Sequence, residues 1–387
     1  MSTCRQRSMS EPFDSLDDAM RQAIRLAERG VGSVEPNPAV GAVVIDDEAR
    51  LLGEGYHRAC GGAHAEIEAL RAAGDRAVGA TLVVTLEPCC HQGRTPPCTE
   101  AVLAAGVARV VVGIEDPSRH AAGRGIAALR AAGVAVEPGV LADEIEVLNA
   151  PFLKRIRTGR PWVHAKWAMT LDGRIAARSG HSRWISGEAS RRIVHRLRGR
   201  MDAIIIGRGT VDADDPLLTA RPPGPRIPTR IVLDTDAALP VDSQLVRTAG
   251  EVPVLVVTGA DADARRIGQL EAAGVELLRL PADDAGHPDP GQLLDELGRR
   301  EMTNVLVEGG ASVLGSFFDH RLLDELHVFL APRLVGGRDA VPAVGGVGLE
   351  QVPDMPQLDA VNVERLDDDV YLRGRVRRDG ESGSLSG

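Results

Sequence analysis

Cysteine is scarce in this 387-residue chain, and long apolar runs are absent. Five cysteines are an odd number and are not spaced like a disulfide framework, so we expect a reducing compartment. Residues 1–18 lack the apolar run of a signal peptide. No segment approaches the roughly 20 apolar residues that a membrane span needs. These absences predict a cytoplasmic protein without a membrane partner.

An excess of positive charge is also absent. The 45 lysines and arginines are outnumbered by 55 aspartates and glutamates, which gives a net charge of −10. A nucleic-acid-binding surface normally shows as a basic patch, so we expect no nucleic-acid partner. Small anionic substrates remain compatible with this charge, because a few local arginines can bind them on an acidic protein.

Helical and strand patterns alternate along the chain, which is typical of mainly parallel sheets covered by helices. In the first part we expect helices at 14–30, 64–74, 97–106, 123–133 and from 141, and strands at 39–46, 50–57, 80–88 and 109–116. A second set starts at 161–170, with helices at 186–199, 264–274, 290–301 and 311–321, and strands at 201–207, 230–235, 252–259, 275–280, 304–310 and 325–335. Length also favours two domains. They are expected at 1–150 and 160–375, before a disordered tail at 376–387.

One histidine, one glutamate and two cysteines carry the strongest chemical signal. His64 and Glu66 lie at the start of an expected helix, and Cys89 follows a proline and precedes Cys98. One imidazole and two thiolates suit zinc, and three protein ligands leave the fourth position to water, as in catalytic sites. Glu66 is then free to move a proton from this water to a leaving amine. Nucleobase deaminases combine these residue types in this order.

Cys90 and His91 are rival metal ligands. A fourth protein ligand would close the site and make it structural rather than catalytic. Adjacent side chains usually point apart, so we do not expect Cys89 and Cys90 to hold one ion. The remaining cysteines, Cys4 and Cys60, are interpreted as small buried hydrophobic residues.

The segment between the two cysteine ligands is unusually long. Eight residues separate Cys89 from Cys98, where the common deaminase spacing has two. The inserted CHQGRTPP contains a glycine and two prolines, so it is expected to loop out beside the metal. His91 and Arg94 would then add a wall to the pocket, with positive charge for a phosphate.

Five segments together resemble the deaminase half of the bifunctional riboflavin-biosynthesis deaminase/reductase family. They are PNPAVGAVV, GEGYH, HAEIEAL, TLEPCCHQGRTPPCTEAV and DPSRHAAGRG. The resemblance implies a cytidine-deaminase-like α/β/α sandwich with one zinc per chain and a substrate pocket lined by Asn37, His57, His91, Arg94 and Asp116. Ser118 stands where the family usually has Asn, which removes one expected substrate hydrogen bond. Cys90 stands where Ser is common, which supports its not being a ligand.

Taken alone, the second half has weaker signals. In NVLVEGGASVLGSFF, the N–H groups at the helix start can cradle a phosphate, but a glycine pair after a strand is often only a tight turn. The pattern is not the G-x-G-x-x-G of dinucleotide folds. The segment GRGTVDADDPLLTAR offers charged groups, but it reads equally well as a solvated loop.

In this order, and with AMTLDGRIA and SRWIS, these segments resemble the reductase half of the same family. The resemblance covers about Ser15 to Gly374 and implies a dihydrofolate-reductase-like α/β domain that uses NADPH. It implies cofactor contacts from Ala168, Trp184, Thr210, Asp214, Gly310, Ala311, Ser312, Val313, Leu314, Gly315 and Ser316. It implies substrate contacts from Ser182, Arg198, Leu218, Arg221 and Glu308. Because the arginine fork matches phosphate oxygens, Arg198 and Arg221 are expected to clamp a ribose 5-phosphate. Glu308 is the candidate for a polar or proton-handling role near the sugar.

Our interpretation is a bifunctional enzyme, compatible with a homo-oligomer. Its first half would deaminate 2,5-diamino-6-(5-phosphoribosylamino)pyrimidin-4(3H)-one with zinc, and its second half would reduce the ribosyl side chain to ribityl with NADPH. One alternative is another zinc nucleoside, base or tRNA deaminase fused to an unrelated reductase-like domain. The acidic charge, the long cysteine spacing and the matching second half count against it. A second alternative is a zinc-stabilised binding protein, and Glu66 beside an open three-ligand site counts against that.

Overall fold

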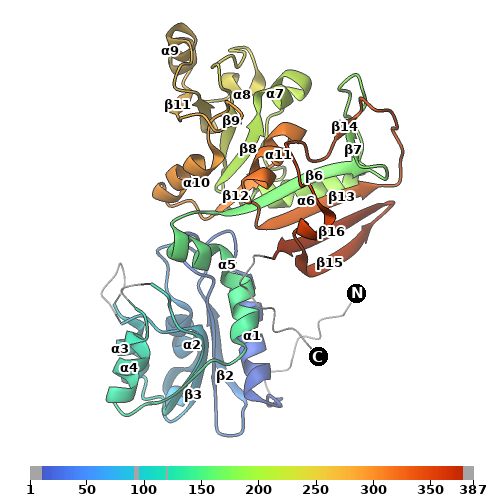
Figure 1. Cartoon of the computed structure of the whole chain (residues 1–387). Coiled ribbons are helices and arrows are strands. Elements are labelled where there is room, and N and C mark those ends of the chain that lie inside the picture. The colour runs from blue at the N-terminus through green and yellow to red at the C-terminus, as the bar shows by residue number, and fades with distance from the viewer. Residues whose placement is uncertain (1–10, 91–95, 119–120, 378–387) are drawn as a thin grey trace. The chain divides into compact units, whose positions relative to one another are not determined.

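The computed structural model describes residues 11–90, 96–118 and 121–377. The chain divides into two compact units between Thr158 and Gly159, each with its own sheet (Figure 1). No helix among these described residues is both long and apolar enough to cross a bilayer.

The first unit holds a five-stranded sheet in the order β2-β1-β3-β4-β5. Its strands are β1 (Gly41–Ile45), β2 (Leu51–Tyr56), β3 (Thr81–Leu86), β4 (Arg109–Ile114) and β5 (Ala135–Pro138). Its helices are α1 (Leu16–Glu28), α2 (Ala65–Ala73), the 3-10 helix η1 (Gly74–Ala77), α3 (Cys98–Ala104), α4 (Arg124–Ala131) and α5 (Ala142–Thr158). β1 is antiparallel to β2 and β3, whereas β3, β4 and β5 are parallel. β5 was not expected, because its four residues are exposed or half-exposed and form no apolar run.

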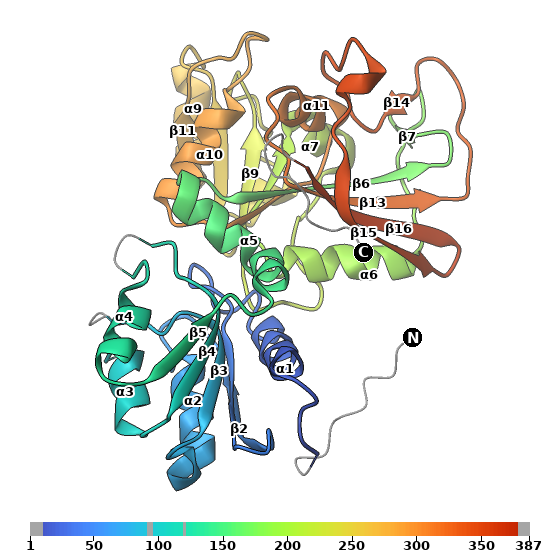
Figure 2. The ribbon, with the colours of Figure 1, turned by 60° about the horizontal axis from the view of Figure 1, so that its bottom comes forward.

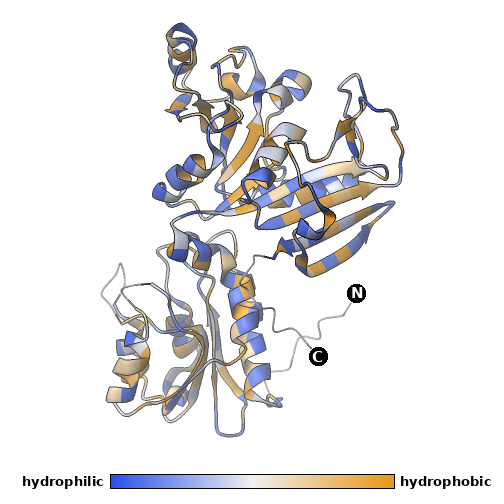
Figure 3. Ribbon diagram, viewed as in Figure 1, coloured by the Kyte–Doolittle hydropathy of each residue, from blue (hydrophilic) through white to orange (hydrophobic). Residues whose placement is uncertain are grey.

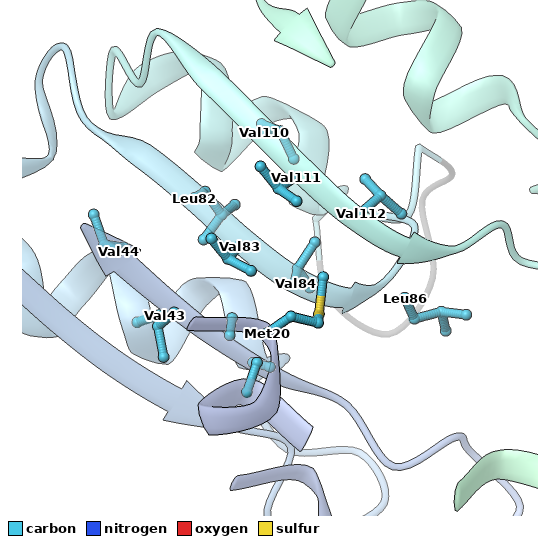
Figure 4. Packing of buried hydrophobic residues seen from close by; sticks show 14 of the residues in the cluster. Met20, Val43, Val44, Leu82, Val83, Val84, Leu86, Val110, Val111 and Val112 are labelled. Atoms are coloured by element: carbon cyan, nitrogen blue, oxygen red, sulfur yellow. The ribbon is translucent and has the colours of Figure 1, made fainter. Parts of the chain in front are cut away.

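Helices cover both faces of this sheet, which gives an α/β/α sandwich (Figure 2). α1 packs on β1 and β3 and touches α5, while α2, α3 and α4 form a second helical group. The central strands are therefore apolar on both faces. Val43 of β1 pairs with Val83 of β3, which pairs in turn with Val111 of β4, and all three are fully buried (Figure 4).

The second unit holds a nine-stranded sheet in the order β11-β10-β9-β8-β12-β6-β13-β16-β15 and a small pair, β14-β7. Its strands are β6 (Trp162–Thr170), β7 (Arg174–Ala176), β8 (Ala203–Gly207), β9 (Thr229–Leu233), β10 (Val254–Thr258), β11 (Glu276–Arg279), β12 (Asn304–Val307), β13 (Glu325–Ala331), β14 (Val341–Pro342), β15 (Leu358–Leu366) and β16 (Asp369–Val376). Its helices are α6 (Glu188–Arg198), α7 (Arg208–Asp214), α8 (Gln244–Arg247), α9 (Ala264–Ala272), α10 (Pro290–Arg299), α11 (Ala311–Asp319) and the 3-10 helix η2 (Val352–Asp354). The large sheet is parallel from β11 to β13, and β16 and β15 add an antiparallel hairpin.

Three core clusters cover the faces of the large sheet, and one of them packs Ile204 of β8 and Leu306 of β12 with the apolar residues of α8 and α9. On one face Val163 of β6 and Val305 of β12 pack with apolar residues of α10 and α11. On the other, Phe329 of β13 packs with Ile193 of α6 and with Tyr371 of β16. Hydrophobic and hydrophilic residues accordingly alternate along β13, β16 and β15 (Figure 3).

Three features of this unit differ from the sequence expectations. Residues 208–214 form the helix α7, for which the sequence analysis predicted no helix, and only Val211 of it is buried. The hairpin β15–β16 was not expected, and β15 is mostly exposed. Val376, placed in the expected tail, ends β16, and Arg377 donates its backbone N–H to Gln357. Residues 378–387 of that tail lie outside the described residues.

Candidate active sites

One edge of the first sheet collects most of the polar residues singled out in the first half. β2, β3 and β4 run in the same direction, so their carboxyl ends share an edge with the start of β1. His57 follows β2, Cys89 follows β3, Asp116 follows β4 and Asn37 precedes β1. The topology therefore brings together residues that are far apart in sequence.

His64, Cys89 and Cys98 converge at this edge. His64 directly precedes α2, and Cys98 is the first residue of α3. The Nδ1 atom of His64 lies 3.1 Å from the Cys98 sulfur and 3.6 Å from the Cys89 sulfur. The backbone N–H of Cys98 also points at the Cys89 sulfur, at 3.3 Å. All three potential ligand atoms lie within 4.8 Å of one another.

The chemistry of this donor set fits a zinc ion. The hydrogen bond between the two sulfurs lowers the pKa of Cys89 to about 4 and raises the pKa of Cys98. A dication allows both sulfurs to be thiolates. One imidazole and two thiolates are a usual tetrahedral set for zinc, and they leave one coordination position open.

Glu66 lies in the first turn of α2, directly beside these ligands. Its side chain is buried, and its carboxyl is hydrogen-bonded to Cys98. Burial raises the pKa of Glu66 above the ordinary value for a glutamate. A carboxyl group with a raised pKa can both accept a proton and give it back near neutral pH.

The other candidate ligands have different outcomes. Cys90 is half-buried and is not among the three residues whose ligand atoms converge in the described part of the chain. His91 and Arg94 lie outside the described residues. The interpretation of Cys60 as a buried hydrophobic residue is wrong, because Cys60 is exposed in the turn that precedes α2. Cys4 is likewise outside the described residues.

Asn37 and His57 form a pair beside His64. The His57 ring donates from Nδ1 to the Ala63 carbonyl at 3.0 Å, since a carbonyl can only accept. Its Nε2 atom is then an acceptor for the Asn37 amide at 3.2 Å. Burial lowers the pKa of His57, so the ring is neutral at physiological pH. Its centroid lies 5.4 Å from that of His64, edge to face.

Glu87 holds the segment that carries Asp116, and the sequence analysis missed it. The buried Glu87 carboxylate accepts four backbone N–H groups: Asp116 at 3.1 Å, Gly123 at 2.9 Å, Gly125 at 2.7 Å and Ile126 at 3.1 Å. Asp116 in turn accepts the N–H of Ser118 at 2.9 Å. One feature of the sequence could have identified Glu87. It is a charged residue at the end of an apolar strand, two positions before a metal-ligand cysteine.

In the second unit, the predicted residues Ser182 and Asp214 meet. The Ser182 hydroxyl donates to the Asp214 carboxylate at 3.1 Å, and Arg183 pairs with the same oxygen at 3.3 Å. The predicted turn at the glycine pair before α11 lies close to another predicted residue, Thr210 of α7. Gly310 has φ +68°, and a Cβ atom added there would lie 3.2 Å from the Thr210 hydroxyl, so α7 lies directly against this turn.

Arg198 and Glu308 form a buried ion pair. Arg198 donates from Nε and Nη2 to the two carboxylate oxygens of Glu308, each at 2.6 Å. Burial acts to raise the pKa of Glu308, but Arg198, Lys166 and His195 outweigh it and the pKa lies below the ordinary value. Glu308 is therefore ionised at neutral pH, which suits a polar contact or a proton acceptor rather than a proton donor. The Nε and Nη2 groups of Arg198, expected to contact a phosphate, are hydrogen-bonded to Glu308 in this structure.

Lys166 is the functional candidate that the sequence analysis missed in this half. It lies in β6, and the charges of Glu308, Arg198 and Asp214 all act on it. Burial lowers the pKa of the Lys166 amine below the ordinary value. The sequence could have pointed to Lys166, because it is the single lysine in the otherwise apolar strand segment AKWAMT.

Three of the predicted contact residues have side chains in the core, and a fourth, Gly315, is packed against backbone. Val313 and Leu314 are buried between α11 and the sheet, and Leu218 is buried with φ +53°. A Cβ atom on Gly315 would lie 2.3 Å from the Gly345 backbone, so Gly315 serves packing. At the start of α11, Gly310 and Ala311 are half-buried and Ser312 is exposed.

The remaining predicted residues lie at the surface or beside α6. Trp184 is 63% exposed and is stacked by Arg191, whose guanidinium lies 4.7 Å from the ring centroid. Ala168 packs with the α6 cluster, and Ser316 is half-buried on α11. Arg221 is exposed, and its charge acts on His195 together with that of Arg198.

Two family models match the chain, in separate parts. The model described as the cytidine and deoxycytidylate deaminase zinc-binding region matches residues 14–114, and the RibD C-terminal domain matches residues 161–372.

Similar proteins extend over nearly the whole chain. The riboflavin biosynthesis protein RibD of Actinobacillus pleuropneumoniae is 41% identical over 355 residues, which cover 92% of this chain and 94% of that protein. The RibD protein of Escherichia coli strain K12 is 40% identical over 366 residues, 91% of this chain and 97% of that one.

Solved structures agree over the same span. Acinetobacter baumannii RibD has a TM-score of 0.81 at 37% identity and covers 94% of this chain and 99% of its own. A Thermotoga maritima diaminohydroxyphosphoribosylaminopyrimidine deaminase/5-amino-6-(5-phosphoribosylamino)uracil reductase has a TM-score of 0.80 at 35% identity, with the same coverage.

Proposed function

This chain belongs to the RibD family of bifunctional deaminase/reductases of riboflavin biosynthesis, and on that premise we propose which of its residues perform the two reactions. The deaminase half depends on zinc and the reductase half on NADPH. The deaminase substrate is 2,5-diamino-6-(5-phosphoribosylamino)pyrimidin-4(3H)-one, and the reductase then converts the ribosyl side chain of the product to ribityl.

His64, Cys89 and Cys98 hold the zinc in this proposal, and their convergence is the observation that carries it. When bound, zinc supplies a water molecule activated for attack on a ring carbon. Glu66 takes a proton from the attacking water and gives it to the amine nitrogen that leaves as ammonia. Asn37 and His57 face the same edge and orient the pyrimidine by hydrogen bonds.

Lys166 has the central role that we propose in the reductase half. NADPH supplies the hydride when it is bound. Reduction at C1′ opens the ribose ring, and the ring oxygen then needs a proton. Lys166, on which the charges of Glu308 and Asp214 act, donates that proton. Arg198 keeps Glu308 ionised, and Arg221 binds the substrate phosphate.

Three further expectations stay part of this proposal. The enzyme works in the cytoplasm, forms a homo-oligomer and needs no nucleic-acid or membrane partner. The net charge of −10 supports the absence of a nucleic-acid partner. Light scattering after size exclusion measures the oligomer, and a monomer at micromolar concentration would contradict that part.

A Glu66→Gln variant tests the deaminase assignment. The amide still forms hydrogen bonds but cannot carry a proton, so ammonia release should fall by about 10²–10⁴-fold. Zinc content and reduction of the deaminated substrate should stay at the wild-type level. Glu68→Gln, on the same helix and paired with Arg71, is the matched control and should keep both activities. Near-normal ammonia release by Glu66→Gln would overturn the proposal.

A further inference from the structure

A second group of side chains that can bind a metal lies in the reductase unit. None of its members is among the residues assigned to the reductase reaction. It consists of His164 on β6 and of Glu325 and His327 on the neighbouring parallel strand β13. Glu325 lies opposite His164 in the strand register, and His327 lies two residues further along β13. Residues two apart in a strand point to the same face, so all three side chains share one face of the sheet.

The three side chains are buried. The exposed side-chain fractions are 8% for His164 and 2% for both Glu325 and His327. Polar groups are costly to bury unless they are hydrogen-bonded or coordinate a cation. The burial of two imidazoles and a carboxylate together therefore has to be offset by hydrogen bonds or by a bound cation.

The ligand atoms of the group converge. The Nδ1 atom of His164 lies 3.2 Å from Nε2 of His327. The two Glu325 oxygens lie 3.9 Å from Nδ1 of His164 and 3.4 Å from Nε2 of His327. Tetrahedral zinc with bonds of about 2.0–2.1 Å sets neighbouring ligand atoms roughly 3.3 Å apart. The distances at the His64 site of the same chain, 3.1 and 3.6 Å, are of the same size.

Each of the three groups also has a partner on its outer side. The second ring nitrogen of His164 lies 3.1 Å from the Asn304 amide oxygen, and that of His327 lies 2.7 Å from the Tyr371 hydroxyl. Partners of this kind fix the ring orientation of metal-ligating histidines and are a regular feature of protein metal sites.

Glu325 follows the same pattern. Its carboxylate accepts the indole N–H of Trp162 at 3.3 Å and an N–H group of Arg373. The two histidines and the carboxylate are thus held from behind, with one donor atom of each directed at the others.

We propose that His164, Glu325 and His327 bind a divalent first-row transition metal ion, with zinc as the expected ion. Two imidazoles and one carboxylate are a common zinc donor set, and imidazole does not favour magnesium or calcium. The ion links β6 to β13 across their pairing. His327 lies opposite Lys166 in the register of these two strands. The bound ion therefore also holds β6, the strand that carries Lys166, in place against β13.

The test uses the full-length chain with the first site removed. In a Cys89→Ser/Cys98→Ser variant, incubation with zinc and removal of the excess should leave one zinc per chain by elemental analysis. Adding His164→Gln and His327→Val should abolish it. Circular dichroism checks that both variants are folded. The wild-type chain should hold two zinc ions.

Cobalt distinguishes the two sites spectroscopically. Cobalt(II) in the doubly cysteine-substituted variant should show the visible bands of a tetrahedral site without a thiolate-to-cobalt charge-transfer band. Wild-type protein should show both. A folded Cys89→Ser/Cys98→Ser variant without bound metal overturns the proposal, since its second site is intact. That result would mean that the two rings and Glu325 form only a direct hydrogen-bonded network, and it leaves the proposed reactions unaffected.

Discussion

The guanidinium of Arg198 and the carboxylate of Glu308 form a two-point ion pair, with both N–O distances at 2.6 Å. Arg198 comes from α6 and Glu308 from the end of β12, and both side chains are largely buried. The pair engages the Arg198 fork, whereas Arg221, the other arginine of the expected phosphate clamp, is exposed. It also keeps Glu308 ionised beside Lys166.

The assignment of the phosphate to Arg221 predicts a selective loss. Arg221→Ala should lower the reductase kcat/KM by about 10–100-fold, the loss of a charge-assisted contact of about 1.5–3 kcal/mol. Ammonia release should not change. Arg265→Ala, an exposed arginine on α9, is the control and should leave both activities intact. The kinetics are compared on phosphorylated and dephosphorylated substrate, and an equal loss on both would exclude a phosphate contact.

Breaking the Arg198–Glu308 pair should be costly. Arg198→Met leaves a buried carboxylate without its partner, which typically costs 3–5 kcal/mol, so unfolding of the reductase unit should shift to lower denaturant concentration. Arg198→Met/Glu308→Gln removes both charges and should recover part of that loss. Denaturant titrations of the three proteins decide this, and a double variant no more stable than Arg198→Met would argue against a stabilising pair.

The same pair predicts an acid limit to stability. The Glu308 pKa is lowered from the model-compound value of 4.5, so its contribution is complete above pH 4.5 and decreases as the pH falls toward the folded-state pKa. Glu308→Gln cannot titrate and should reduce the pH dependence of stability below 4.5. Melting temperatures from pH 3 to 7 measure it, and identical slopes for wild type and variant would contradict the prediction.

Zinc content separates neighbouring cysteines in the deaminase half. Cys98→Ser should lose most of the zinc of this site, because Cys98 lies 3.1 Å from His64 Nδ1. Cys90→Ser should keep it, because Cys90 is outside the converging group. Elemental analysis in the His164→Gln/His327→Val background excludes any contribution from the second group. Zinc loss in Cys90→Ser would require a different ligand set.

Glu87 should act as a positioning residue for Asp116. Glu87→Gln has one acceptor oxygen in place of two and should loosen the four backbone contacts of the segment that carries Asp116. We expect the deaminase KM to rise by about 10-fold or more while zinc content stays unchanged. Glu100→Gln, in the first turn of α3 and exposed, is the control. A fall in kcat at constant KM would point to a different role.

The sequence alone determined the chemistry of the deaminase half. His64 and Glu66 are two residues apart at a helix start, and the spacing of Cys89 and Cys98 is a local property of the chain. Local order of this kind can be interpreted before the fold is known. The alternation of helices and strands likewise predicted the α/β class of both halves, because periodicity is local too.

Only the tertiary structure decided which distant side chains meet. The pairing of Arg198 with Glu308 depends on where α6 lies against β12, and the four contacts of Glu87 depend on the turn after β4. His164 and His327 become neighbours through the register of β6 with β13. The order of strands in a sheet is set by packing between elements far apart in sequence. Hydrophobic periodicity shows that a strand exists, but it does not show which strand lies beside it.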